Sequence, residues 1–339
     1  MKHNILITGG SGFVGSQVAT QLHEAGHKIT IVDRVDKKYN VPGHIIVRDY
    51  HSFFFHNKIQ FDTVIHLAAD HLVEQSVTEP AKYYVNNVIK MKEMLDNMVA
   101  VGIKNIIFSS SGNTYGRQGA AGFPLKEDIY YDPENPYAST KVAGEMLIRD
   151  YSKAYGLNYV NFRYFNAAGA DPQCRFGYTQ RPATHVIPIL CNKILNKQPF
   201  TIYGNDYDTF DGSCVRDYVS VADIATAHER AIEFLNMGGK NEVFNIGGGS
   251  SGISVKQLVN IAAEVVGVDP VVEYAGRRAG DPAMLVADIS KAKQLLNWSP
   301  QYTIRDTITH AWDWEKKFEK STDTYHNDDT DGRWENGES

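Results

Sequence analysis

The sequence predicts an α/β fold, in which a doubly wound parallel sheet is followed by a smaller C-terminal α/β region that binds substrate. Through the first 166 residues, short apolar runs alternate with helix-like segments, which is typical of a parallel sheet with helices on both faces. The central runs VIHLA and NIIFS are apolar throughout, as expected for strands buried on both sides. A glycine-rich turn directly follows the first run, and this combination is typical of Rossmann-type folds.

The first half of the chain contains the predicted strands and one long predicted helix. The strands are expected at Asn4–Thr8, Lys28–Asp33, Ile45–Val47, Thr63–Leu67, Ile106–Ser109 and Tyr159–Phe165. The helix is expected from Pro80 to Val101, because apolar residues recur there at helical spacing. Pro80 suits its first turn, and Gly102 suits the position just past its end. The apolar stripe consists of Tyr84, Val88, Met91, Leu95 and Met98.

After about Asn166 the regular alternation gives way to a Gly- and Pro-bearing stretch and then to shorter elements. We predict a Rossmann domain over residues 1–166, to which later segments return, and a mainly substrate-binding region over residues 167–320. Ligands are expected in the crevice between them. Residues 321–339 carry six acidic residues and one basic residue and are expected to form a disordered tail. Helices are predicted at Val186–Asn196, Val221–Leu235, Ser254–Val266 and Ile304–Phe318.

Composition argues against several classes of protein. The net charge of −6, from 34 basic and 40 acidic residues, gives no support for nucleic-acid binding. No run of 18 apolar residues occurs, so no membrane span is expected, and no signal peptide is recognisable. The three cysteines, Cys174, Cys191 and Cys214, lie far apart. They predict neither a disulfide framework nor a metal site, and they suit a reducing cytoplasm.

The segment from Thr8 to Gly15 predicts a dinucleotide site. Its glycines follow the spacing GxxGxxG, and they let backbone N–H groups approach a pyrophosphate at a helix N-terminus. The turn follows the first strand directly and opens a helix, which is the context that this signal needs. The residues expected to contact the cofactor here are Gly9, Gly12, Phe13, Val14 and Gly15.

Asp33 ends the second predicted strand, 18 residues after Gly15. An acid at this position accepts hydrogen bonds from the adenosine ribose and repels a 2′-phosphate, so it favours NAD over NADP. Arg34 is the complication, because its guanidinium could pair with that phosphate.

Tyr137 and Lys141 form the predicted catalytic pair. They lie four residues apart at the start of a predicted helix, and therefore on one face of it. A nearby ammonium favours the phenolate and lowers the pKa of the tyrosine, so Tyr137 could take the proton of a sugar hydroxyl while hydride leaves the same carbon for NAD. Ser111 follows a buried strand and is the predicted hydroxyl that orients the substrate.

Several long motifs resemble the extended short-chain dehydrogenase/reductase family, and within it the UDP-glucose (UDP-galactose) 4-epimerases. They include GGSGFVG, HLAADH, FSSSGNTYG, NPYASTK, RYFNAAGA, FNIGGG and RRAGDP, and the resemblance extends from Lys2 to about Phe318. It implies that Tyr137 is the base, that Lys141 holds the nicotinamide ribose and that Ser111 hydrogen-bonds the sugar. It also implies a homodimer in which the helices from Pro80 and from Tyr137 pair across the interface. Further cofactor residues implied are Asp49, Leu67, Ala68, Ala69, Asn86, Ser109 and Tyr164.

At some positions this chain differs from the motifs of related enzymes, and these differences limit the reactions that are expected of it. Dehydratases of this kind carry an Asp-Glu pair where this chain has Gly112 and Asn113, so elimination of water is not expected. His71 stands where the best-known epimerases have a lysine near the cofactor phosphates, and a mostly neutral histidine predicts weaker retention of the cofactor. Leu285 occupies a position that is linked to acceptance of N-acetylated sugars, and that question stays open.

A nucleotide diphosphate needs cations at its phosphates, and Arg216 and Arg278 are the candidates because arginine binds phosphate oxygens bidentately. The alternative is that Arg216–Asp217 and Arg278–Asp281 are surface ion pairs. By resemblance, both arginines face the diphosphate. The resemblance also implies contacts from Asp281 to the ribose, from Tyr203 to uracil, and from Asn166 and His185 to the phosphate or sugar.

The sequence thus predicts NAD-dependent C4 epimerisation of a nucleotide-diphosphate sugar through a transient 4-keto intermediate. One alternative is an oxidoreductase or reductive epimerase that releases its cofactor, which His71 and Arg34 keep open. Another is a non-catalytic dinucleotide sensor. The sugar and the base are not determined by the sequence.

Overall fold

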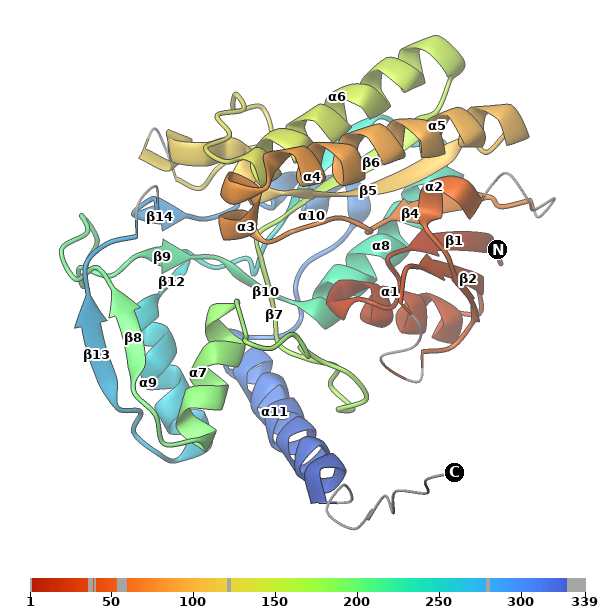
Figure 1. The fold of residues 1–339 in the computed structure, drawn as a ribbon. Helices are drawn as coiled ribbons and strands as arrows, with labels where there is room; N and C mark the ends of the chain where they lie inside the picture. The colour runs from red at the N-terminus through yellow and green to blue at the C-terminus, as the bar shows by residue number, and fades with distance from the viewer. Residues whose placement is uncertain are drawn as a thin grey trace, which may run out of the picture.

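A sheet of seven parallel strands forms the centre of the computed structural model, which describes residues 2–35, 39, 41–53, 60–120, 123–278 and 281–327 (Figure 1). The strand order is β11-β6-β5-β4-β1-β2-β3, so the direction of winding reverses between β1 and β4. All the predicted strands of the first half are present. The strands are β1 (Asn4–Thr8), β2 (Lys28–Asp33), β3 (His44–Val47), β4 (Thr63–His66), β5 (Asn105–Ser111), β6 (Asn158–Tyr164) and β11 (Glu242–Ile246).

Helices cover both faces of this sheet because successive strand residues are apolar and point to opposite sides. Ile5 and Ile7 pack toward α1 and α8, whereas Leu6 packs toward α5. Figure 1 shows α5 and α6 along one side of the sheet and α1 and α8 along the other. One side carries α2 (Tyr50–Phe53), α5 (Lys90–Val101) and α6 (Pro136–Tyr155), and the other carries α1 (Phe13–Glu24), α8 (Val221–Asn236) and α10 (Ser290–Leu296).

The predicted helix from Pro80 to Val101 forms, with Pro80 in its first turn and Gly102 in the left-handed conformation at its end. It is interrupted by one π-helical segment: α4 (Pro80–Tyr84) continues into η2 (Val85–Ile89) and then into α5. The wider turn shifts the buried face, so the predicted stripe is wrong at its start. Tyr83 is fully buried, whereas Tyr84 is 43% exposed.

A smaller C-terminal region packs around α7 (Val186–Leu195), α9 (Val255–Val266) and α11 (Ile304–Asn327), which share one apolar cluster. These helices and α8 match the predicted ones. Since α11 continues to Asn327, residues 321–327 of the predicted tail are helical, and residues 328–339 lie outside the described part. The short strands here are β7 (Asn166–Ala168), β8 (Phe200–Tyr203), β9 (Val215–Arg216), β10 (Tyr218–Ser220), β12 (Ile253–Ser254), β13 (Val272–Ala275) and β14 (Met284–Leu285).

The chain crosses between the two regions more than once. After β10, α8 and β11 return to the large sheet, where β11 pairs with β6 along Glu242–Ile246. Two short elements, α3 (Val73–Thr78) and η3 (Gly112–Ala120), follow β4 and β5 at the carboxyl edge of the sheet. Among the described residues, no helix combines the length and the apolar character that crossing a membrane requires.

Candidate active site

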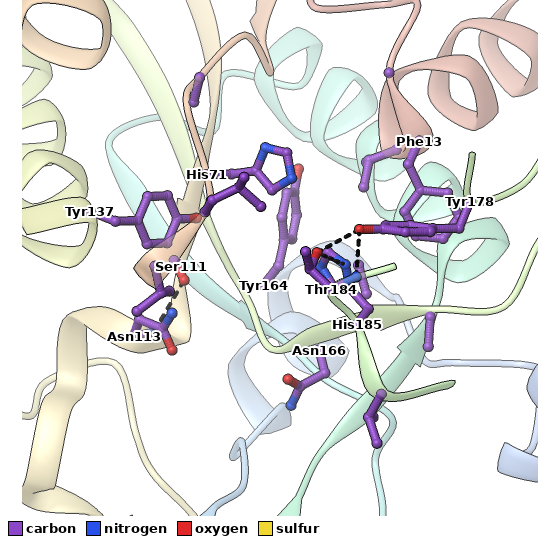
Figure 2. Close-up of a pocket in the computed structure, with 18 of the residues that line it drawn as sticks. Phe13, His71, Ser111, Asn113, Tyr137, Tyr164, Asn166, Tyr178, Thr184 and His185 are labelled. Atoms are coloured by element: carbon purple, nitrogen blue, oxygen red, sulfur yellow. Dashed lines mark hydrogen bonds between the residues drawn. The ribbon is translucent and has the colours of Figure 1, made fainter. Parts of the chain in front are cut away.

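A cavity of about 1530 Å³ opens at the carboxyl ends of β1, β2, β4 and β5 and extends to the smaller C-terminal region. Figure 2 shows residues from both regions around it, with Tyr137 and Ser111 on one side and Phe13, Tyr178 and His185 on the other. Every site residue predicted from the sequence lines this cavity except Asp49. The two halves of the predicted site therefore form one continuous space.

The glycine turn fits the diphosphate of a dinucleotide. Gly9 has a φ of +74°, and a Cβ added at Gly15 would lie 2.2 Å from the carbonyl oxygen of Gly9. Only glycine allows this tight turn, and α1 begins directly after Gly12, which has no side chain to cap it. The free N–H groups of the first helical turn therefore lie at the cavity, where they favour an anion.

Asp33 is fixed at the cavity by the backbone. Its carboxylate oxygens accept hydrogen bonds from Ser11 N at 3.0 Å and from Val35 N at 3.3 Å. The side chain lines the cavity at the end of β2, the position from which an acid binds the adenosine ribose.

A buried polar atom without a partner supports the predicted role of Asn86. Asn86 is 5% exposed and lines the cavity, and its Oδ1 has no hydrogen-bond partner among the described residues. An unpaired buried acceptor costs free energy, so a ligand donor is expected there. The π-helical segment η2 is what turns this residue inward.

Asp49 does not line the cavity, contrary to the prediction from family resemblance. Its carboxylate accepts hydrogen bonds from Lys90 and from His51, the latter at 2.9 Å. Burial alone would raise the pKa of Asp49, but these two partners hold it below its usual value. The neighbours Arg48 and Tyr50 line the cavity instead.

The start of α6 places the predicted catalytic pair. Asn135 caps the helix by accepting from Ala138 N at 2.9 Å, and Pro136 occupies the first turn. Lys141 Nζ donates to the carbonyl of Ser109 at 2.6 Å and lies 5.8 Å from the centre of the Tyr137 ring. Lys141 and Tyr137 are thus joined to the end of β5, as the spacing predicted.

The pKa values of Tyr137 and Lys141 differ from those that the sequence predicted. Burial raises the pKa of Tyr137, and a hydrogen bond with Ser111 opposes this, whereas Lys141 is not among the causes. Burial also lowers the pKa of Lys141, to about 7, against the opposing effect of Glu145. The predicted lowering of the Tyr137 pKa by the ammonium is therefore not found.

Beneath the catalytic pair lies a buried ion pair that the sequence analysis missed. Glu145, one turn after Lys141, is 3% exposed and accepts from Arg163 Nη2 at 2.8 Å. It also accepts from Ser110 Oγ and from the Tyr131 hydroxyl. An acid one turn after the lysine is the sequence signal that could have found it.

Arg216 does not form the surface ion pair with Asp217 that the sequence left as an alternative. Arg216 pairs with Asp281, whereas the carboxylate of Asp217 accepts from the backbone N–H groups of Gly248 and Ala287 at 2.6 and 3.1 Å. Arg216 is only 9% exposed, so this is no surface ion pair.

The predicted aromatic and polar contacts also line this end of the cavity. The Arg278 guanidinium lies over the ring of Tyr203 at 4.2 Å. Asn166 Nδ2 donates to the Asp217 carbonyl at 2.9 Å.

His185 lies between two aromatic neighbours, one of which, Tyr178, also packs edge-on against Phe13 of the glycine turn with centroids 5.6 Å apart. The His185 ring packs edge-on against Tyr178 with centroids 4.8 Å apart, and stacks with His71 at 6.3 Å. Burial, with His71 as the second cause, lowers the pKa of His185 to about 4. Tyr178 and Thr184, whose hydroxyls are 2.6 Å apart, are cavity residues that the sequence analysis missed, because they lie in an irregular stretch without periodicity (Figure 2).

Comparison with known proteins finds several relatives that are described as UDP-glucose 4-epimerases, among them the following three. A curated UDP-glucose 4-epimerase from Halalkalibacterium halodurans is 40% identical over 340 residues, covering 96% of this chain and 99% of the relative. A UDP-glucose-4-epimerase from Stenotrophomonas maltophila, solved with bound NAD and formylated UDP-arabinopyranose, superposes with a TM-score of 0.90 at 28% identity, covering 94% of this chain and 99% of the other. The Brucella ovis UDP-glucose 4-epimerase in complex with NAD gives a TM-score of 0.87 at 36% identity, with 93% and 98% covered.

The model of the NAD dependent epimerase/dehydratase family matches residues 5–247. This range includes the glycine turn, Ser111, Tyr137, Lys141 and Arg216, and it confirms the resemblance to extended short-chain dehydrogenases/reductases. Since the match covers well over half of the chain, this chain belongs to the NAD dependent epimerase/dehydratase family.

Proposed function

We propose that this chain catalyses the NAD-dependent C4 epimerisation of a nucleotide-diphosphate sugar of the UDP-glucose/UDP-galactose type. The observation that carries the proposal is the meeting of Ser111, Tyr137 and Lys141 at the end of β5, inside the cavity that the glycine turn also lines. Near-full-length similarity to UDP-glucose 4-epimerases supports it.

In this proposal, Tyr137 takes the proton of the C4 hydroxyl and later returns it, while Ser111 orients that hydroxyl. Lys141 holds the ribose next to the reacting carbon. Bound NAD would supply reversible hydride acceptance from C4 next to these residues. The flat 4-keto sugar must turn over between the two transfers.

The substrate anchors lie on the opposite side of the cavity. Arg216 and Arg278 supply positive charge for the diphosphate, and arginine retains its charge at any physiological pH. Tyr203 offers a flat face to the base, and Asp281 an acceptor to the ribose. His185 and Asn166 complete the set of proposed contacts. The keto sugar can rotate only if the protein binds the nucleotide tightly and holds the sugar loosely.

We further propose that the protein is a cytoplasmic homodimer with cofactor-binding and substrate-binding regions divided near residue 166. The free cysteines Cys174, Cys191 and Cys214 suit a reducing compartment. Exposed apolar residues on the helices from Pro80 and Pro136, among them Tyr84, Ile89 and Met146, support pairing of these helices with a second copy.

The test is to mix the purified protein separately with UDP-glucose, UDP-N-acetylglucosamine, UDP-xylose and UDP-glucuronate and to follow the anomeric NMR signals. We expect at least one sugar to reach an equilibrium of two C4 epimers without net formation of NADH. Stoichiometric consumption or formation of NADH or NADPH would instead identify an oxidoreductase. Absence of any sugar-nucleotide binding by calorimetry would favour the sensor.

A further inference from the structure

Arg34 is the residue that left the choice between NAD and NADP open, and it lies at the cavity. It follows Asp33 at the end of β2, and both residues line the cavity. A guanidinium beside the adenosine ribose is the usual means of accommodating a 2′-phosphate. The residues around Arg34 therefore decide what it can bind.

Asp70 faces this guanidinium from the loop between β4 and α3. It follows β4 at the same edge of the sheet, and its Oδ1 lies 3.4 Å from Arg34 Nη2. The Asp70 side chain is 15% exposed, and its second oxygen is buried without a hydrogen-bond partner among the described residues. The charge of this carboxylate is therefore directed at Arg34.

The backbone of Asp70 is held in place by Asn87. Asp70 N donates to Asn87 Oδ1 at 2.9 Å, and Asn87 Nδ2 donates back to the Asp70 carbonyl at 2.9 Å. Asn87 is 4% exposed and also donates to Thr140 Oγ1 on α6 at 3.1 Å. Asp70 is thus fixed relative to the helix that carries Tyr137.

The carboxylate oxygens of Asp33 accept hydrogen bonds from the backbone N–H groups of Ser11 and Val35. Arg34 thus follows a carboxylate that the backbone fixes at the cavity, and its guanidinium pairs with a second carboxylate, that of Asp70. We propose that Asp70 is a residue that determines cofactor specificity, because it occupies Arg34 and adds a second negative charge against the 2′-phosphate of NADP. This inference rests on the proposed use of NAD.

The Arg34 side chain is 53% exposed, and exposed ion pairs of this kind contribute little to stability. Loss of the Asp70 charge is therefore expected to change cofactor choice without unfolding the protein. Asp70→Asn keeps the size of the side chain and removes the charge, and Asp70→Ala serves as a second variant. Glu74→Gln is the matched control, because Glu74 also lines the cavity and the change in net charge is the same.

Each purified full-length protein is equilibrated at low salt with a one-to-one mixture of isotopically labelled NAD⁺ and NADP⁺ and then desalted. The retained nucleotides are measured by mass spectrometry, and the labelled fraction shows when exchange is complete. We expect Asp70→Asn to shift the retained ratio toward NADP by about tenfold, Glu74→Gln to leave it within about twofold, and Arg34→Ala/Asp70→Asn to cancel most of the shift.

An unchanged ratio in both Asp70 variants after complete exchange would overturn the proposal, as would a shift that persists in the double variant. Failure of the wild type to retain either nucleotide would instead contradict the proposed function itself. Thermal unfolding of each variant verifies that the compared proteins are folded.

Discussion

The Tyr137 hydroxyl lies beside Ser111 on a half-buried side chain at the cavity, and burial raises its pKa. We expect Tyr137→Phe to bind NAD and UDP-sugar like the wild type, because it removes a single oxygen. Turnover should fall by about 10² to 10⁴, the usual contribution of general acid–base catalysis. The rate of C4 inversion by NMR and the affinity for UDP-glucose by calorimetry check this. Near-normal turnover would remove Tyr137 from its proposed role.

Lys141 provides a pH test of the buried cation. Its pKa is about 7 in the folded chain and 10.5 as the ordinary value. Between these values the unfolded chain binds a proton that the folded chain lacks, so this group makes stability rise with pH. Below pH 7 both states are protonated, and burial of the charge costs its full amount, on the order of 5 kcal/mol.

We therefore expect Lys141→Met to be more stable than the wild type at neutral pH, and the difference to shrink as the pH rises toward about 10. Urea midpoints at several pH values measure this. A difference that stays constant with pH would show that Lys141 is not buried as a cation.

Much of the site was predictable residue by residue, since Ser111, Tyr137 and Lys141 belong to motifs with fixed spacing. What the sequence could not give were partners that are distant along the chain. Asp49 forms an ion pair with Lys90, and Arg216 pairs with Asp281 rather than with its neighbour Asp217. Such pairings depend on which loops the fold brings together, and the spacing of residues in the sequence does not predict them.

The glycine turn between β1 and α1 depends on close approach of backbone. A Cβ at Gly15 would lie 2.2 Å from Gly9 O and 2.7 Å from Gly10 Cα, so Gly15→Ala must open the turn. We expect a cost of about 1–3 kcal/mol from overpacking and at least about tenfold weaker NAD binding. Gly276→Ala is the control, because a Cβ there meets nothing within 4 Å. Thermal unfolding and NAD titration check both, and equal behaviour of the two variants would contradict the tight turn.

The strands β5 and β6 and the helix α6 are joined by the buried pair Glu145–Arg163, in which each side chain is 2% exposed. Glu145→Gln leaves a buried guanidinium without its anion and should cost about 3–5 kcal/mol. Glu145→Leu/Arg163→Met removes both charges and should be less destabilised than that single variant. Chemical unfolding measures both. A double variant that loses as much stability as Glu145→Gln or more would show that the charges themselves do not matter.

Periodicity predicted the helices well but not the π-helical segment Val85–Ile89. A single wider turn leaves the apolar pattern of α5 intact and only displaces its start, so Tyr83 replaces Tyr84 in the core. The same turn brings Asn86 to the cavity and Asn87 to Asp70. Such local insertions leave no clear trace in an apolar stripe.

Across the whole molecule, alternation of strands and helices predicted the parallel sheet, and the glycine turn predicted where its site lies. The contribution of Glu242–Ile246 as β11 was less accessible, because this strand follows the first six by nearly 80 residues and pairs with β6. The separation of residues 242 and 164 means that only the tertiary fold joins them. The crevice between the regions is formed by such returns of the chain.

The proposed homodimer is tested on the outer face of the helices beside the sheet, where Figure 1 shows α4 and α5 alongside α6. Val85 is 46% exposed and Ile89 is 51% exposed. Val85→Glu/Ile89→Glu would bury two unpaired charges in an interface between copies, which costs several kcal/mol, so we expect a monomer. Val268→Glu/Val271→Glu alters residues of similar exposure, 55% and 61%, beyond α9 and should stay dimeric. Light scattering after size exclusion gives the masses. A monomeric wild type would contradict the proposed homodimer. A Val85→Glu/Ile89→Glu variant that stays dimeric would place the interface elsewhere.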